Sequence, residues 1–241
     1  MNRFEVSWTD ELPELIRQHG SVIVTSMREG IAIVIGYSGQ FGLEARSYSF
    51  PHAGGITYFG GSLCISGSNG YYAFKPIEYS GCTLHLLKSK IYFGRIQPHE
   101  LHSNNSRIWV GNTGFNCIAE VNDESSFTPF WYPPFISQSD SIGDRCHLNG
   151  FALSPEAKIP EYATLFCRTN SIAGWREANA SDGCVYRMST NEVICDRLLR
   201  PHSPVVYNDK LYFLESGSGK LIELDRVTNA VRDVHKAFGF V

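Results

Sequence analysis

Short apolar runs separated by small and polar residues recur along the chain from residue 20 onward. Each repeat has an apolar run, a turn rich in Ser, Asn and Gly, and a second apolar run. Such pairs occupy residues 20–35, 61–74, 106–121 and 209–224, and a further pair split by an insertion occupies 161–170 and 183–190. Apolar runs of this length, bounded by turn residues, are typical of β-strands, so each pair predicts a β-hairpin. Four of the turns end on a glycine, and a tight turn needs a residue that tolerates a positive φ. We therefore predict a positive φ at Gly30, Gly70, Gly114 and Gly219.

The hairpins are part of a longer repeat. An apolar segment precedes each of the last four hairpins, and another follows every hairpin, so the complete repeat contains four predicted strands. Its length of about 41 to 55 residues is that of one blade of a β-propeller. We therefore expect an all-β fold, a β-propeller with five recognisable four-stranded blades, in which residues 1–241 form a single domain.

The beginning of the chain departs from this pattern. Residues 1–19 form a short N-terminal segment, in which residues 10–18 predict a helix capped by Asp10. The first repeat lacks an innermost strand of its own. Two arrangements are compatible with this: a compact five-bladed ring closed by one terminus, or an incomplete six-bladed ring.

Composition narrows the class of protein and its partners. The chain is 43% hydrophobic and 19% charged and has 22 glycines, a balance that suits a turn-rich β protein. Its net charge of -3 gives no electrostatic reason to expect nucleic acid or an anionic membrane as a partner. The N-terminal residues do not resemble a signal peptide, and no apolar run is long enough to span a bilayer.

The seven cysteines are scattered and contain no Cys-x-x-Cys pair. Several, such as Cys64 and Cys167, lie in apolar runs. Free cysteine is among the most frequently buried residue types, so we expect reduced, buried thiols and a cytoplasmic location.

Histidines recur near the predicted start of the innermost strand of successive blades, and three of the four follow a proline. They are His52, His99, His147 and His202. The innermost strands of a propeller surround a central channel. We therefore expect the four imidazoles at equivalent positions, facing the axis.

The stretches DRCHLNGFAL (144–153), GWREANASDGCV (174–185) and RPHSPVVYNDKLYFLESGSGKL (200–221) resemble an uncharacterised family of bacterial hypothetical proteins. Its members look like six-bladed propellers, and the resemblance runs from about residue 20 to residue 241. The family has no established activity that the resemblance would imply for this chain.

Several candidate site residues match the family's motifs. His99 and Glu100 match an Ile-His-Glu motif, and His147, Asn149 and His202 match as well. Two departures accompany these matches. The family usually has another residue at position 52, which implies a site of three histidines rather than four. It also continues after Gly-Phe with a further blade, and the resemblance implies that this chain lacks that last blade.

Converging imidazoles predict a metal site, because neutral histidine nitrogens bind Zn, Fe or Ni. The expected ligands are His99, His147 and His202, and His52 is the candidate fourth ligand. Glu100 would orient a ligand or act as a base. Without a metal, His147 or His202 would transfer protons, since imidazole titrates near neutrality. The alternative is that the repeated histidines are structural and hold neighbouring blades together.

A polar insertion at residues 168–182 carries Trp175 and Arg176. A loop of this length on a blade is typical of a lid or a binding loop, although surface decoration is equally compatible. Together with Asn149, these two residues are the expected ligand-binding groups, suited to a sugar ring or a carboxylate.

The leading hypothesis is a small-molecule site at the axial channel, with lyase, isomerase or hydrolase chemistry on a polar substrate and a divalent transition metal as the candidate cofactor. The alternative is a non-catalytic propeller scaffold that binds a protein or a glycan. The sequence contains neither a Gly-x-Ser-x-Gly elbow nor a His-Glu-x-x-His pair, so serine hydrolases of that type and zincins are excluded.

Overall fold

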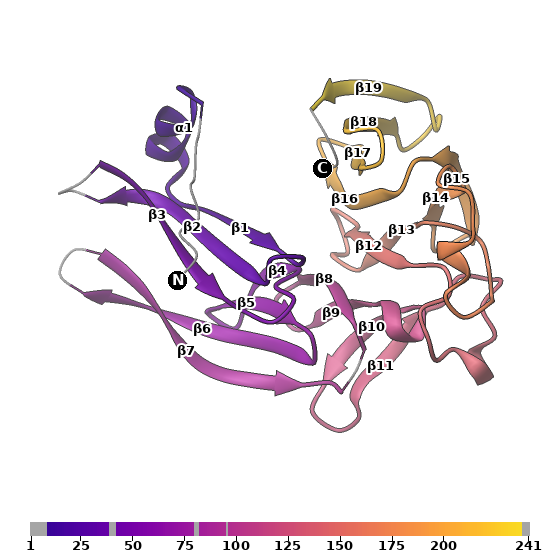
Figure 1. Cartoon of the computed structure of the whole chain (residues 1–241), viewed down its shortest axis with the longest axis horizontal. Helices are drawn as coiled ribbons and strands as arrows, with labels where there is room; N and C mark the ends of the chain where they lie inside the picture. Colours follow the sequence, from indigo (N-terminus) through magenta and orange to yellow (C-terminus); the bar gives the residue numbers. More distant parts are fainter. Residues whose placement is uncertain (1–8, 39–41, 80–81, 95, 238–241) are drawn as a thin grey trace.

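The computed structural model describes residues 9–38, 42–79, 82–94 and 96–237. The strands in this part of the chain form five antiparallel sheets, each built from consecutive strands. Figure 1 shows the sheets following one another around an arc, with the first and the last at its two ends. The all-β, five-bladed propeller expected from the repeats is thus confirmed.

Four of the sheets have four strands in simple meander order. The innermost strands are β4, β8, β12 and β16, and the outermost are β7, β11, β15 and β19. The second sheet contains β4 (Ile56–Phe59), β5 (Ser62–Gly67), β6 (Gly70–Tyr79) and β7 (Cys82–Tyr92). The third contains β8 (Pro98–Ser103), β9 (Ile108–Asn112), β10 (Cys117–Asn122) and β11 (Ser126–Trp131). The fourth contains β12 (Leu148–Leu153), β13 (Pro160–Leu165), β14 (Gly183–Arg187) and β15 (Glu192–Leu198), and the fifth β16 (Pro201–Tyr207), β17 (Lys210–Glu215), β18 (Lys220–Asp225) and β19 (Val231–Lys236).

The first sheet has three strands, β1 (Val22–Ser26), β2 (Ile31–Ser38) and β3 (Gly42–Ser49). β1 and β2 correspond to the predicted hairpin, so the strand missing among the described residues is the innermost one, as the sequence predicts.

The predicted N-terminal helix is present as α1 (Leu12–His19), but Asp10 does not cap it. The helix begins after Glu11, whose side chain makes no capping hydrogen bond. Pro13 lies in the first turn, where its missing N–H removes no intrahelical bond. The helix ends at Gly20, which has a φ of 90°.

Two of the four glycine predictions are wrong. Gly30 and Gly219 have positive φ values of 62° and 70°, as expected, whereas Gly70 and Gly114 do not. At Gly70 the reason for glycine is close approach, because a Cβ there would lie 1.8 Å from the carbonyl oxygen of Ile91 on β7. At the turn of Gly114, the left-handed residue is Asn116, with a φ of 53°.

The core consists of apolar layers between successive sheets, and these layers differ in extent. Among the described residues, thirteen buried side chains pack between the third and fourth sheets. Only four, including Leu63 and Ile65, pack between the first and second. Most described residues of the outermost strands are half-buried or exposed.

The described cysteines are free thiols, and five of the six are buried. Burial raises the pKa of Cys117 and of Cys184 to about 12, so these thiols are uncharged at neutral pH. This confirms the prediction of buried cysteines, and their reduced state in the cell stays a prediction. The side chain of Cys82 lies outside the description.

Candidate functional site

The histidines at the centre of the molecule lie at or just before the starts of the innermost strands. Pro98, Leu148 and Pro201 begin β8, β12 and β16, and each pairs with the last residue of the following strand of its sheet. The residue after it in each strand therefore occupies an equivalent position of the repeat. These equivalent residues are His99, Asn149 and His202.

His147 is therefore not equivalent to His99 and His202, which corrects the expectation of a regular ring of imidazoles. It lies just before β12 and has a φ of 51°. The residues at the same position before β8 and β16 are Gln97 and Arg200, with φ values of 51° and 53°. The histidine spacing in the sequence thus combines two different positions of the repeat.

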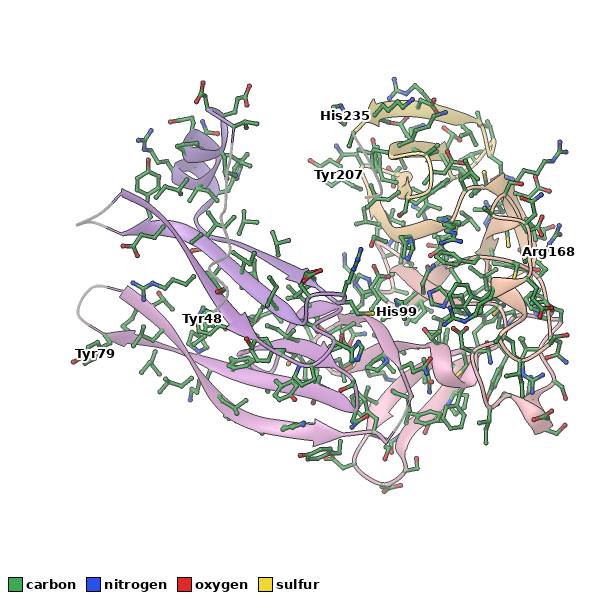
Figure 2. All side chains as sticks on the ribbon, in the orientation of Figure 1. Tyr48, Tyr79, His99, Arg168, Tyr207 and His235 are labelled. Atoms are coloured by element: carbon green, nitrogen blue, oxygen red, sulfur yellow. The ribbon has the colours of Figure 1, made fainter. Side chains whose placement is uncertain are left out.

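The structure nevertheless brings His99, His147 and His202 together. The rings of His99 and His147 meet edge to face with their centroids 4.9 Å apart. Phe166, which follows β13, contacts both His147 and His202, at centroid distances of 4.5 and 5.0 Å. Figure 2 labels His99 in the middle of the molecule, between the first two sheets and the last two.

A carboxylate holds the ring of His147. Nδ1 of His147 lies 2.8 Å from Oδ2 of Asp144, and the backbone N–H of His147 donates to Oδ1 of Asp144 at 3.0 Å. An ionised carboxylate only accepts hydrogen bonds, so Nδ1 donates to Asp144, and in the neutral form of the ring Nε2 would carry the lone pair. This is the arrangement of an oriented base or of a metal ligand.

Burial keeps the other two imidazoles uncharged. It lowers the pKa of His99 well below its ordinary value, and His147 and His202 lower it further. Burial and the neighbouring His147 likewise lower the pKa of His202 to about 4. Nδ1 of His202 lies 3.0 Å from the hydroxyl of Ser216 and 3.2 Å from the carbonyl oxygen of Arg200. The carbonyl oxygen can only accept, so the tautomer that donates to it carries its lone pair on Nε2.

An aromatic layer covers His147. The ring of Trp175 lies over that of His147, with centroids 4.2 Å apart and an interplanar angle of 33°. Trp175 belongs to η3 (Gly174–Arg176), a 3-10 turn in the predicted insertion. The guanidinium of Arg176 stacks on Trp175 at 4.2 Å and is exposed. The insertion thus places Trp175 against His147, and its role as a binding loop stays a prediction.

Asn149 and Glu100 connect strands of neighbouring sheets. Asn149 donates to the carbonyl oxygen of Pro201 at 3.0 Å and accepts from the Thr164 hydroxyl at 2.7 Å. Glu100 accepts the backbone N–H of Phe151 at 2.8 Å. These contacts link β8 to β12 and β12 to β16. The predicted ligand-binding role of Asn149 and the catalytic role of Glu100 stay predictions.

His52 is placed differently from the other three. It lies in the exposed turn before β4 with a φ of 55°, and no ring contact joins it to the central trio within the described part of the chain. The same part contains no group of three His, Cys, Asp or Glu side chains already arranged to hold a metal ion. The metal site with His99, His147, His202 and His52 stays a prediction.

Two residues of the site were not singled out from the sequence. Asp144 precedes His147 by three residues, the spacing at which an Asp side chain accepts a backbone N–H in a turn. That signal was present in DRCH. Phe166 has no comparable local signal, because only the pairing of β13 with β12 brings it beside the histidines.

Fold and site together define a β-propeller protein with three histidines and an aromatic layer at its centre. The sequence matches the family model described as Domain of unknown function (DUF4915) over residues 10–241, and the chain belongs to this family. No curated protein matches the sequence. No helix among the described residues is long and apolar enough to cross a membrane.

Solved structures share the fold at low sequence identity. A streptogramin B lyase is 12% identical with a TM-score of 0.50, over 90% of this chain and 66% of that chain. An auxiliary nutrient binding protein from Bacteroides thetaiotaomicron is 11% identical with a TM-score of 0.57, over 90% and 54%. This chain therefore spans about two thirds of the lyase's length and about half of the nutrient binding protein's. At such identities the likeness concerns the fold alone.

Proposed function

We propose that the centre of the propeller binds a small polar molecule and that His147 exchanges a proton with it. The observation that carries the proposal is the 2.8 Å contact between His147 Nδ1 and Asp144. A carboxylate on one imidazole nitrogen orients the ring and stabilises the imidazolium that forms when the other nitrogen takes a proton. His147 is then the proton acceptor through Nε2, and Asp144 is its positioning residue.

The surroundings of His147 support a polar ligand with a flat or ring-shaped face. His99 and His202 are uncharged at neutral pH because burial lowers their pKa values, so they offer neutral hydrogen-bonding groups. Phe166 and Trp175 present aromatic faces, on which a sugar ring or a conjugated group stacks. Arg176, stacked on Trp175, adds a positive charge suited to a carboxylate of the ligand.

Proton exchange at His147 is compatible with the three reaction classes expected from the sequence. In a lyase, His147 would take a proton from carbon while the electron pair forms a double bond and expels a group from the neighbouring carbon. In an isomerase, the imidazolium would return the proton at another carbon. In a hydrolase, His147 would take a proton from the attacking water, and the imidazolium would then give a proton to the group that leaves as the substrate bond breaks.

A deuterium-incorporation screen tests the proposal. A mixture of sugars, sugar acids and hydroxy acids is incubated with the protein in heavy water, and mass spectrometry detects compounds that gain deuterium or change mass by elimination or hydrolysis. We expect the wild type to convert at least one compound, His147→Gln to convert none, and Asp144→Asn to be slower by about 100-fold, within the usual range for general acid–base catalysis.

The matched control is His235→Gln, since His235 lies on the outermost strand β19 and is exposed. It should convert the same compound at the wild-type rate. Conversion that persists in His147→Gln would contradict the assignment of His147.

A metal-dependent form of this site is a second candidate. It is favoured by the Nδ1 contacts of His147 and His202 with protein oxygens, since metal-bound histidines generally donate their other ring N–H in this way. The proposed ligands of a Zn, Fe or Ni ion are these two residues and His99, with His52 as a fourth. Elemental analysis of the purified protein should then find about one metal ion per chain. The metal should be lost in His147→Ala and retained in His235→Ala.

The non-catalytic alternative is favoured by the exposed guanidinium of Arg176 stacked on the half-buried ring of Trp175, a pair suited to a glycan. Under this alternative, binding to a glycan array would be lost in Trp175→Ala and unchanged in His147→Gln. Loss of binding in both variants would instead favour the central site.

A further inference from the structure

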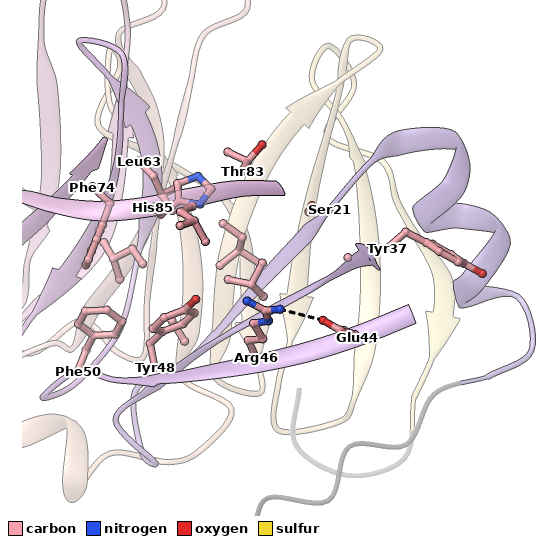
Figure 3. Close-up of a pocket in the computed structure, with 16 residues that line it drawn as sticks. Ser21, Tyr37, Glu44, Arg46, Tyr48, Phe50, Leu63, Phe74, Thr83 and His85 are labelled. Carbon is pink, nitrogen blue, oxygen red and sulfur yellow. Dashed lines mark hydrogen bonds and ion pairs between the residues drawn. The ribbon is translucent and has the colours of Figure 1, made fainter. Parts of the chain in front are cut away.

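A cavity of about 280 Å³ lies between the first and second sheets, away from the central histidines. Its walls come from β1, β2 and β3 on one side and from β5, β6 and β7 on the other. Figure 3 shows residues from both walls around it. No residue of the proposed axial site lines it, so its function is independent of that proposal.

The cavity results from residue size along one strand. β2 presents Ala32, Val34 and Gly36 to the second sheet at every second position, and side chains on one face of a strand alternate in this way. Facing sheets are usually about 10 Å apart and need bulky side chains to fill the space. These three side chains on one face of β2 are too short to fill that space.

The inner end of the cavity is apolar. Phe50, Leu63, Ile65 and Phe74 line it, and Phe50 and Phe74 meet edge to face with their centroids 5.4 Å apart. Leu63 and Ile65 are buried members of the thin apolar layer between these sheets. This end suits an aliphatic or aromatic group.

The outer end is polar and carries both signs of charge. Arg46 and Glu44 lie on the same face of β3, with a guanidinium nitrogen of Arg46 3.1 Å from Oε2 of Glu44. Thr83 and His85 line the cavity from β7, on the opposite wall. The guanidinium has five N–H donors, so its contact with Glu44 leaves donors for a second carboxylate.

We propose that this cavity binds a hydrophobic α-amino acid. The apolar side chain occupies the end lined by Phe50 and Phe74, and the ammonium and carboxylate groups lie at the outer end. Glu44 accepts from the ammonium, and Arg46 donates to the carboxylate. Adjacent opposite charges match a zwitterion, and the volume is near the lower limit of ligand pockets, roughly 300 Å³, which suits a single amino acid.

Isothermal titration calorimetry with L-phenylalanine and L-leucine tests the proposal, and two analogues isolate the charges. 3-Phenylpropionate lacks the ammonium group, and 2-phenylethylamine lacks the carboxylate. We expect phenylalanine to bind and each analogue to bind at least about tenfold more weakly, the equivalent of roughly 1.4 kcal/mol. No binding of either amino acid at millimolar concentration, or an analogue that binds as tightly as phenylalanine, would overturn the proposal.

Variants locate the site. Glu44→Gln and Arg46→Gln should each weaken phenylalanine binding by about tenfold, and Val34→Phe should abolish it by filling the cavity. Arg28→Gln is the matched control, because Arg28 forms a comparable exposed pair with Glu29 at 3.8 Å outside the cavity. Thermal melting verifies that each variant folds. If Val34→Phe does not fold, the affinities of the two charge variants test the proposal. Affinity unchanged in both charge variants, or reduced equally in the control, would contradict the assignment.

Discussion

At the scale of single residues, burial determines the charge of two central imidazoles. The pKa of His202 is lowered from 6.5 to about 4, and that of His99 is lowered as well. In the unfolded chain both rings have ordinary pKa values and bind a proton below about pH 6.5. Between pH 6.5 and 4 the unfolded state therefore binds more protons than the folded state, and stability rises with pH in this window.

We expect the urea midpoint of unfolding to fall as the pH is lowered from 6.5 to 4, and the wild type to take up about two protons on unfolding near pH 5. His202→Gln should have a shallower dependence on pH, because one titrating ring is removed. Urea titrations at several pH values measure both slopes. His235→Gln, in which an exposed ring is replaced, should keep the wild-type slope. A His202→Gln slope equal to that of the wild type would show that His202 has a similar pKa in both states.

At the scale of strands, glycine permits close approach of two strands at one end of the second sheet. A Cβ at Gly70 would lie 1.8 Å from the carbonyl oxygen of Ile91, so β6 or β7 would have to shift. We expect Gly70→Ala to lower the free energy of unfolding by about 2 kcal/mol, as overpacking does. At Gly111 a Cβ would meet its nearest atom at an ordinary 3.6 Å, so Gly111→Ala should change stability by less than about 1 kcal/mol. Equal effects of the two changes in urea unfolding would contradict this explanation.

A charged side chain connects the third and fourth sheets. Glu100 on β8 accepts the backbone N–H of Phe151 on β12. Glu100→Ala would leave that N–H without its acceptor, and we expect it to lower the free energy of unfolding by about 1–3 kcal/mol. Glu100→Gln keeps an acceptor oxygen and should restore most of the stability. The same pair of variants separates structure from catalysis, since a stable Glu100→Gln protein without turnover would support the predicted base.

At the scale of the whole molecule, the apolar layers predict unequal local stability. The layer between the third and fourth sheets includes fully buried Trp109 and Leu165, whereas that between the first and second has few buried members. Local opening is easiest where few apolar contacts are lost. We expect backbone amides of β9 and β13 to exchange most slowly with heavy water, and those of β1 and β2 most rapidly. Uniform protection across the five sheets, measured by mass spectrometry, would contradict this ranking.

Much of the element pattern could be predicted because it depends on neighbouring residues. The apolar runs and their turns indicated one hairpin in each sheet, and the three-stranded first sheet followed from the missing segment before residue 20. Predictions about single turn residues were weaker. Gly70 looked like a turn glycine, yet its role depends on Ile91 of the next strand, which the turn sequence does not contain.

The site was predicted in part for the same reason. The recurrence of histidines near strand starts predicted that His99, His147 and His202 lie near one another, and the structure places them so. The same pattern also predicted that His147 is equivalent to the other two, which is wrong. Only the register of β12 against β13 shows that Asn149 takes that position. A shift of two residues keeps a side chain on the same face of a strand, so the pattern of apolar and polar residues could not reveal the difference.

The sequence by itself determined the repeat, the class of fold and the residue types at the centre, because hydrophobic periodicity and turn residues act over a few positions along the chain. The tertiary structure decided which side chains meet there. It placed Phe166 and Trp175 against His147, and it left a cavity beside the small residues of β2. Both outcomes depend on contacts between segments far apart in the chain, and the shape of a space between sheets depends on all of its walls at once.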